Sequence, residues 1–534
     1  MSNLLSTQPG KPSASKRHFG AGDGWGAGMR AQGGFNTFPA TPTAGAQTPV
    51  VATSGAQTAG HPLQDTRHNI RLLDQENEIK RAFADIEAIM ADIGGAITGA
   101  DAAERIQAIA QARLGFEFPV DWLNGSWSRP VNVRRLFAYS VFKAFEKLAA
   151  RKFDRQYAEW SDGESAPELI QKWGFHAIDI TPCADGRLSG VVDYILRVPP
   201  TVVTSRKSFA GAMFDVEENV RCWADVELRR HREGVPNAAD EPTRYLKIGV
   251  YHTSSSDPSH EGCAAHGSDE RQAAQALLDR VNAFQQAVEN SYCCGATVAT
   301  LLIGVDTDTD AIKVHIPDAA GALSLDRYVD NADMFETTRS MSREQAKDAI
   351  RATVARVAGV ADDDAATEGM RWFAGYLLKN NMAQIEYVRA YHDGRYPDLG
   401  HTERFITVGD SFDDVQMRNL AYQAQMETVE EGAADMDVGI KIFKGLNIKN
   451  DLPVPVFVHF QYSGAVPGAR ERAVARGLRL EQAIRDRYAG LVSHKWLYTF
   501  VSVRDQAGAG PIEMIEGAEF NTSGKCSCSC QKKD

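Results

Sequence analysis

A cysteine, an aspartate and an arginine alternate in the stretch PCADGR, residues 182–187. Cys183, Asp185 and Arg187 come directly after FHAIDIT (175–181), a run of alternating apolar residues that predicts a β-strand. A thiolate is a ligand that zinc prefers, and an arginine holds a neighbouring carboxylate ionised in a charge-assisted pair. The stretch therefore predicts a polar site at the end of a strand.

A second stretch, VYHTSSSDPSHEGCAAHG (250–267), adds an imidazole and another thiol. Together with Cys183, His252 and Cys263 would make a set of two cysteines and one histidine. Three such ligands leave a fourth tetrahedral position of zinc for water, whereas a structural site usually has four ligands with tight CxxC pairs, and no CxxC occurs in the chain. If metal binds, an open catalytic site is favoured; spacing alone also allows ordinary buried or solvated side chains.

The elements that must position these residues alternate in type. Between residues 156 and 400 the strands and helices alternate, which predicts an α/β domain with a substantially parallel sheet. A long amphipathic helix, ERQAAQALLDRVNAFQQAVENSY, precedes the third strand. The expected strands are AIDIT (177–181), YLKIGVYH (245–252), ATLLIGVD (299–306) and AIKVHIP (311–317).

The same order of patterns recurs between residues 401 and 520. RFITVGDSFDD is similar to AIDITPCADGR, VPVFVHFQYSG to YLKIGVYHTSS, and LYTFVSVRD to LLIGVDTD. Three matches in one order indicate an internal duplication. The expected counterparts are Gly409 for Cys183 and Tyr462 for His252, so the second copy would lack the ligands and serve packing.

The remaining segments differ from these two copies. Residues 66–155 show helical spacing of apolar residues and predict a small helical domain. Residues 1–65 are rich in Gly, Ala, Pro, Ser and Thr and predict a disordered leader, either a plain flexible segment or a set of basic-aromatic hooks that fold on a partner. Residues 521–534 contain CSCSC, which predicts a disordered tail or a metal or redox site.

The composition excludes several classes of protein. The 534 residues carry a net charge of −12, which disfavours nucleic-acid and membrane-surface binding. No run approaches 18 apolar residues and the first residues lack the apolar core of a signal peptide, so we expect no membrane span and a cytoplasmic protein. Eight cysteines do not suggest a disulfide framework.

At this point the residues resemble a known family. Cys-x-Asp-x-Arg at a strand exit, followed by His and then Cys, is similar to the zinc site of β-type carbonic anhydrases, although that class has His-x-x-Cys and this chain has ten residues between His252 and Cys263. Longer strings resemble the carboxysomal shell carbonic anhydrases over residues 66–520. They are PCADGR, REGVPN, PTRYLKIGVYHTS, GCAAHGS, CCGA, LLIGVDTDTDAI and VGIKIF.

The resemblance implies an α/β fold of two β-carbonic-anhydrase-like sheet domains, one catalytic and one degenerate, with an N-terminal helical domain. It implies that Cys183, His252 and Cys263 hold zinc, with Asp185 and Arg187 as the dyad beside it. The reaction would be reversible hydration of CO₂ to bicarbonate, running toward CO₂ beside Rubisco in a carboxysome. A histidine should carry the proton: we expect His401, with His260 and His266 as alternatives.

The family further implies a homodimer or higher oligomer on the lumenal side of the shell, and a leader that contacts Rubisco or shell proteins. The competing hypothesis is a non-catalytic scaffold braced by zinc, which would have no need of Asp185 and Arg187. A zinc hydrolase lacks support because neither HExxH nor GxSxG occurs. DTDTD (306–310) resembles the start of a calcium loop, but Ala311 and Pro317 replace its glycine and glutamate.

Overall fold

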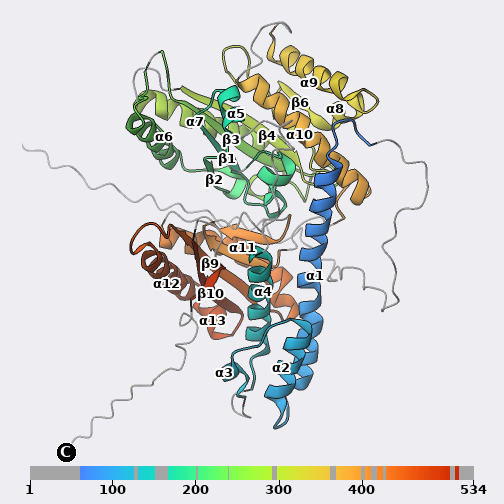
Figure 1. The fold of residues 1–534 in the computed structure, drawn as a ribbon, viewed down its shortest axis with the longest axis vertical. Helices are drawn as coiled ribbons and strands as arrows, with labels where there is room; N and C mark the ends of the chain where they lie inside the picture. The colour runs from blue at the N-terminus through green and yellow to red at the C-terminus, as the bar shows by residue number, and fades with distance from the viewer. Residues whose placement is uncertain are drawn as a thin grey trace, which may run out of the picture. The chain divides into compact units, whose positions relative to one another are not determined.

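The structure is a computed structural model of the whole chain, and it is described here for eleven segments. The described residues are 60–125, 130–150, 166–199, 202–238, 240–291, 297–360, 369–397, 403–410, 418–424, 428–505 and 511–515. They include two β-sheets, each with helices packed on it, and a group of helices near the start of the chain (Figure 1). The mixed α/β class and the N-terminal helices expected from the sequence are confirmed. No helix among these residues is both long and apolar enough to cross a membrane.

The first helices form where the sequence shows 3.6-residue spacing. Asp65 caps the longest of them, because its carboxylate accepts the backbone N–H of His68 at 2.9 Å. The helices are α1 (Thr66–Ala96), α2 (Ala102–Arg113), α3 (Val120–Leu123) and α4 (Val133–Ala150).

The first sheet has six strands in the order β2-β1-β3-β4-β5-β6. The first four are parallel, and β5 and β6 are each antiparallel to the strand before them in this order. All six residues of β1 are buried, as are eight of ten in β3, which is typical of a sheet covered on both faces. The strands are β1 (Ala177–Pro182), β2 (Ser205–Arg206), β3 (Arg244–Thr253), β4 (Thr297–Asp306), β5 (Ile312–His315) and β6 (Tyr328–Asp330).

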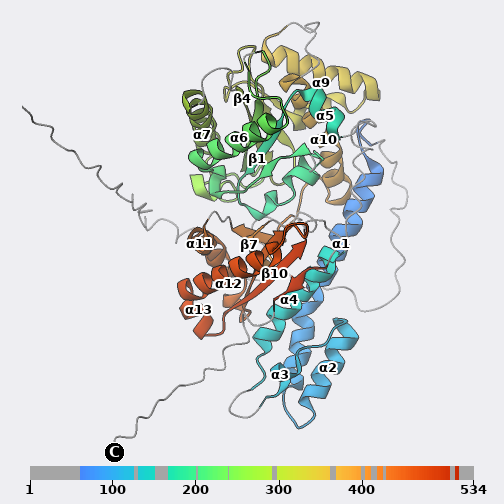
Figure 2. The same ribbon diagram turned by 60° about the vertical axis from the view of Figure 1, so that its left-hand side comes forward.

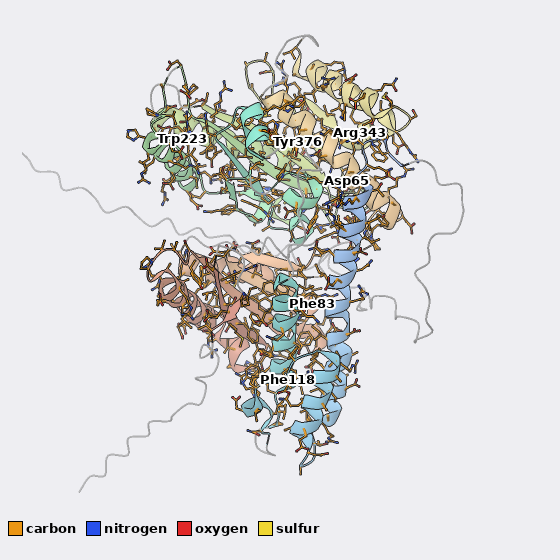
Figure 3. All side chains as sticks on the ribbon, viewed as in Figure 1. Asp65, Phe83, Phe118, Trp223, Arg343 and Tyr376 are labelled. Atoms are coloured by element: carbon orange, nitrogen blue, oxygen red, sulfur yellow. The ribbon has the colours of Figure 1, made fainter. Side chains whose placement is uncertain are left out.

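Helices cover this sheet and share its core. The amphipathic helix expected before the strand at 299–306 is confirmed as α7, which precedes β4 and packs on β3 and β4. The helices are α5 (Ala166–Trp173), α6 (Val216–Arg232), α7 (Glu270–Ser291), α8 (Asn331–Thr338), α9 (Arg343–Ala358) and α10 (Met370–Tyr391). Trp223 on α6 and Tyr376 on α10 are two of the large buried side chains of this core (Figure 3).

The second sheet has five strands in the order β11-β10-β9-β7-β8, of which only β11 is antiparallel to its neighbour. The strands are β7 (Phe405–Gly409), β8 (Ala421–Ala424), β9 (Val454–Tyr462), β10 (Leu497–Asp505) and β11 (Glu513–Met514), and the helices are α11 (Val429–Leu446), α12 (Ala469–Arg487) and α13 (Ala489–Ser493).

The two faces of the second sheet are covered by different parts of the chain (Figure 2). Successive residues of β9 alternate between them: Phe457 packs with α4, whereas Val456 and Val458 pack with α11 and α12. The ring centroid of Phe142 on α4 lies 5.2 Å from that of Phe457, edge to face. Phe83 on α1 joins the same aromatic core (Figure 3). The helical N-terminal region therefore supplies one of the two layers that bury the second sheet.

Candidate active site

Cys183 and His252 are placed by neighbouring strands of the first sheet. β1 and β3 are parallel, so both strands end at the same edge. Cys183 is the first residue after β1, and its backbone N–H donates to the carbonyl of Val250 at 3.0 Å, which continues the strand pairing by one residue. His252 is the penultimate residue of β3. Both side chains are buried, as we expect for residues held at the carboxyl edge of a covered sheet.

Cys263 reaches the same point from a loop. The segment from Ser254 to Gly262 leaves β3 and returns, and Cys263 then begins a short 3₁₀ turn at Ala264–His266. The sulfurs of Cys183 and Cys263 lie 3.9 Å apart. One ligand atom from each of Cys183, His252 and Cys263 lies within 4.8 Å of the others, and no other group of this kind occurs among the described residues. The structure therefore brings together the three residues predicted from the sequence.

The state of these side chains fits a bound cation. Both ring nitrogens of His252 are buried and make no hydrogen bond within the described part of the chain, although Nε2 lies 3.3 Å from Asp185 Oδ2. The contact with Cys263 and then burial raise the pKa of the Cys183 thiol well above its usual range, while the same contact lowers the pKa of Cys263 against the effect of burial. Two thiolates side by side need a positive charge between them, and imidazole and thiolate are donors that bind one.

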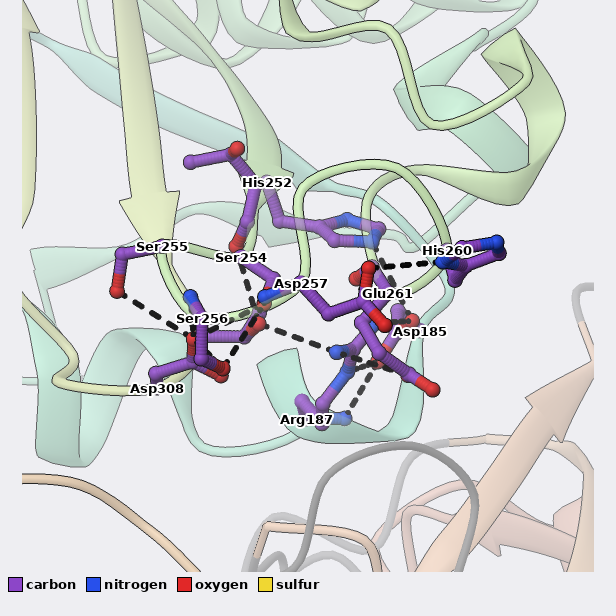
Figure 4. Close-up of polar contacts among 12 residues, drawn as sticks. Asp185, Arg187, His252, Ser254, Ser255, Ser256, Asp257, His260, Glu261 and Asp308 are labelled. Carbon is purple, nitrogen blue, oxygen red and sulfur yellow. Dashed lines mark hydrogen bonds and ion pairs between the residues drawn. The ribbon is translucent and has the colours of Figure 1, made fainter. Parts of the chain in front are cut away.

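Asp185 and Arg187 form a bidentate pair beside this group (Figure 4). Arg187 Nε donates to Asp185 Oδ1 at 2.9 Å, and Arg187 Nη2 donates to Asp185 Oδ2 at 2.8 Å. Asp185 also caps the 3₁₀ turn Gly186–Leu188, because its Oδ1 accepts the backbone N–H of Arg187 at 2.9 Å. Three hydrogen bonds from one residue therefore fix the direction of the carboxylate.

The Asp185 carboxylate also faces the imidazole of the donor group. Its Oδ2 lies 3.3 Å from His252 Nε2. Burial lowers the pKa of His252, but the charge of Asp185 and the contact with Cys183 together outweigh this effect, and the pKa is raised. Burial likewise lowers the pKa of Arg187, but the charge and hydrogen bonds of Asp185, together with the charges of Glu261 and Asp308, outweigh burial and raise it, so the guanidinium stays charged. The pair is therefore electrostatically coupled to the donor group.

Arg187 has further partners that the sequence did not indicate. Its Nη2 donates to the carbonyl of Glu261 at 2.9 Å, and its Nη1 donates to Thr307 Oγ1 at 3.1 Å. The carboxylate of Glu261 lies 3.6 Å from Nη1. The one signal for Thr307 was its position directly after a strand that pairs with the strand of His252.

The histidines expected to carry the proton are placed unequally. His401 lies outside the described residues. His260 is exposed, and its Nδ1 lies 2.9 Å from Asp257 Oδ1 (Figure 4). His266 is half-buried in the 3₁₀ turn that follows Cys263. Both of these alternatives therefore lie on the loop that carries Cys263.

Comparisons with known proteins show the family of this chain. Three family models of the carboxysome shell carbonic anhydrase match the chain. The N-terminal model matches residues 61–153, the catalytic-domain model residues 165–401, and the C-terminal model residues 402–519. The carboxysome shell carbonic anhydrase of Halothiobacillus neapolitanus is 46% identical over 88% of this chain and 93% of its own length. The protein of the same name from Prochlorococcus marinus strain MIT 9313 is 45% identical over 85% of this chain and 88% of its own length. The one from Hydrogenovibrio crunogenus is 41% identical over 88% of this chain and 89% of its own length. The chain therefore belongs to the carboxysome shell carbonic anhydrase family.

Proposed function

We propose that this chain catalyses the reversible hydration of CO₂ to bicarbonate in a carboxysome, with zinc held by Cys183, His252 and Cys263. The observation that carries the proposal is the buried Cys-His-Cys group with the Asp185–Arg187 pair directly beside it. A zinc ion that only braced the fold would have no need of such a pair. The names of the relatives and of the matched catalytic domain support the same activity.

Zinc is the metal that this donor set favours. Two thiolates and one imidazole match its preference, and three protein ligands leave one position open. Bound there, zinc would supply a Lewis acid that lowers the pKa of a coordinated water from about 15.7 toward about 7. Two thiolates compensate much of the metal's charge, so we expect a less acidic water than at a site with three histidines.

Asp185 is proposed to orient the attacking oxygen. Each carboxylate oxygen has two lone pairs, so Asp185 can accept a hydrogen bond from this nucleophile while it still binds Arg187. That hydrogen bond directs a lone pair of the nucleophile at the carbon of CO₂. Arg187 keeps the carboxylate ionised and prevents its rotation, because the guanidinium binds both oxygens.

The hydration step releases a proton that must leave a buried site. We propose His401 as the residue that carries it, since it lies where the catalytic and C-terminal family matches meet. His260 and His266 are the alternatives, and both lie on the Cys263 loop. In a carboxysome the useful direction is bicarbonate to CO₂, which supplies Rubisco.

The second sheet is proposed to be a degenerate copy of the first. The order β2-β1-β3-β4-β5 and the order β8-β7-β9-β10-β11 have the same sequence of parallel and antiparallel pairings. A helix connects the corresponding strands in each case: α7 joins β3 to β4 and α12 joins β9 to β10. This correspondence supports a duplication of one α/β unit.

A shared hydrogen bond supports the same correspondence. In the first sheet the N–H of Ser255, just after β3, donates to Asp306 Oδ1 at 3.0 Å. In the second, the N–H of Gly464, just after β9, donates to Asp505 Oδ1 at 3.2 Å. Both aspartates end the neighbouring parallel strand.

Backbone hydrogen bonds between neighbouring strands shift the expected alignment of the two copies by one residue. The N–H of Cys183 donates to Val250 O at 3.0 Å, and the N–H of Asp410 donates to His459 O at 2.9 Å. Asp410 is then the counterpart of Cys183, one residue beyond the glycine expected from the sequence. By the same register Gln461 is the counterpart of His252, one residue before the expected tyrosine.

The chain is proposed to divide into five parts. We propose a leader over 1–65, a helical domain over 66–155, a catalytic domain over 156–400, a degenerate copy over 401–520 and a tail over 521–534. We also propose that the protein is at least a homodimer and that the leader contacts Rubisco or shell proteins.

The experiment that tests this function measures zinc content and CO₂ hydration in the purified full-length protein and in Asp185→Ala. We expect one zinc per chain in both and a fall in kcat of about 100-fold or more in the variant. Asp318→Ala is the control, because Asp318 caps a turn through Ala320 and Ala322 and contacts no residue of the site. Zinc without hydration activity in the wild type, under both reducing and oxidising conditions, would overturn the proposal in favour of a scaffold.

A further inference from the structure

The turn Asp306–Asp310, with sequence DTDTD, links β4 to β5 at the edge of the sheet where the candidate site lies. Thr253, directly after His252, pairs with Asp306 at the end of β4. The turn therefore lies directly beside the strand end that presents the imidazole. Its sequence suggests a cation loop, but its side chains are hydrogen-bonded to the neighbouring segments of the site.

Asp308 binds the segment that connects His252 with Cys263. It is fully buried, and its Oδ2 accepts from Ser254 Oγ at 2.9 Å, from the N–H of Ser256 at 2.7 Å, and from the hydroxyls of Ser255 and Ser256 (Figure 4). Burial raises the pKa of this carboxyl, but the serine hydrogen bonds outweigh burial and lower it. Donors from three consecutive residues thus converge on one charged oxygen.

Thr307 binds Arg187 directly. Its backbone N–H and its hydroxyl both donate to the carbonyl of Thr253, at 2.9 and 3.0 Å. A hydroxyl has one hydrogen to donate, so the lone pairs of Oγ1 are left to accept. Arg187 Nη1 donates to Oγ1 at 3.1 Å. Thr307 therefore joins the end of β3 to the guanidinium that holds Asp185.

We propose that Thr307 and Asp308 are positioning residues for the hydration reaction. Thr307 fixes Arg187, and Asp308 fixes the Ser254–Ser256 segment from which the chain continues to Cys263. Together they set the position of the Asp185–Arg187 pair relative to the donor group. The inference rests on the roles proposed above for these groups.

The test compares kcat, KM, zinc content and thermal stability of full-length Thr307→Val, Asp308→Ala and Asp308→Asn. Valine keeps the shape of threonine but cannot accept from Arg187. Asparagine can place its carbonyl oxygen at the position of Oδ2 and still accept from the serines. We expect kcat per bound zinc to fall about 10- to 100-fold in Thr307→Val and Asp308→Ala, with KM nearly unchanged, and most of kcat to be kept in Asp308→Asn.

A purely structural role would give a different result. Asp308→Ala would then lose thermal stability or zinc, while its kcat per bound zinc stayed at the wild-type value. A wild-type kcat per bound zinc in both Thr307→Val and Asp308→Ala would overturn the inference. If Asp308→Ala does not fold, Ser254→Ala and Ser256→Ala remove the hydroxyl donors from the other side and must lower kcat per zinc.

Two controls separate this inference from the proposed function. Asp318→Ala removes the carboxylate of a turn that contacts no residue of the site and should leave kcat unchanged. Asp185→Ala with unchanged activity would reject the role of the pair itself. An inactive Asp185→Ala beside fully active Thr307→Val and Asp308→Ala would reject only the positioning role.

Discussion

The guanidinium of Arg187 donates to two residues besides Asp185, and this geometry leads to a prediction at the scale of one residue. Arg187 is only 3% exposed, and its planar fork binds both oxygens of Asp185 as well as Thr307 and Glu261. Lysine would keep the charge but concentrates its donors at one point, so it cannot reproduce the bidentate pair. We expect Arg187→Lys to lower kcat about 100-fold.

Stopped-flow CO₂ hydration and zinc analysis measure this effect. Zinc content should not change, because Arg187 is not in the donor group. Arg327→Lys is the matched control, since Arg327 binds the carbonyl of Ile316 at 3.0 Å and the Asp318 carboxylate, away from the site. Wild-type activity in Arg187→Lys would show that the charge alone suffices and that the pair's geometry is dispensable.

Residue type predicted the donor group better than it predicted the residues that support it. Cys183, His252 and Cys263 could be proposed because thiolate and imidazole are the ligands that zinc prefers and because the strings around them resemble a known family. Thr307 and Asp308 could not, because a hydroxyl and a carboxylate in a turn are usually solvated. Their partners become apparent only once β3 and β4 are paired in register, which places Thr253 beside Asp306.

At the scale of elements, a buried histidine within β9 predicts a dependence of stability on pH. His459 is 1% exposed, and its Nδ1 lies 3.0 Å from Ser502 Oγ. Burial, and then the charge of Arg504, lower its pKa from 6.5 to about 3. The folded protein therefore holds the imidazole neutral at pH values where the unfolded chain already binds a proton.

The sign of the effect follows from this difference. The unfolded state takes up the proton as pH falls through 6.5, so the free energy of unfolding decreases from there until about pH 3. At pH 5 the loss attributable to His459 should be about 2 kcal/mol. Urea unfolding at several pH values measures this free energy. Below pH 6.5 it should decrease less steeply with falling pH in His459→Gln than in the wild type. His494→Gln, at an exposed position, is the control; equal slopes in wild type and His459→Gln would contradict the assignment.

Periodicity predicted the long elements and missed the short ones. The strands of the first sheet with four or more residues and the helix α7 were expected from alternating or 3.6-residue patterns. β2 and β11 have two residues each, which is too short for any period to be visible. In the copy proposed above, Asp410 and Gln461 correspond to Cys183 and His252, one residue away from the expected counterparts Gly409 and Tyr462.

At the scale of the whole molecule, sequence patterns could not show what buries the second sheet. Both of its faces are apolar, since successive residues of β9 pack in different cores. An amphipathic helix such as α4 shows that it needs a partner but not which partner. The aromatic contacts of Phe142 and Phe145 with this sheet become evident only in the folded structure.

The start of the described structure decides how the proposed leader should be removed. His61 is fully buried, stacks on Phe335 with ring centroids 4.5 Å apart, and has its Nε2 2.9 Å from Thr338 Oγ1. Leu63 is buried in the core of the first sheet, and Asp65 caps α1. A deletion of residues 1–65 therefore removes folded contacts together with the leader, whereas a deletion of residues 1–59 keeps them.

We expect the deletion of residues 1–59 to leave CO₂ hydration and thermal stability at wild-type values, because all described parts of the site and its supporting elements lie after residue 60. If the leader is the tether proposed above, the same deletion abolishes incorporation into carboxysomes. The deletion of residues 1–65 should also lower stability, by roughly 1 kcal/mol for the lost helix cap and about 2 kcal/mol or more for the buried leucine. Thermal unfolding and hydration assays on the purified variants, with carboxysome fractionation of cells expressing them, measure these effects. Lost hydration activity in the shorter deletion would contradict a purely tethering leader, and normal incorporation would show that other surfaces recruit the enzyme.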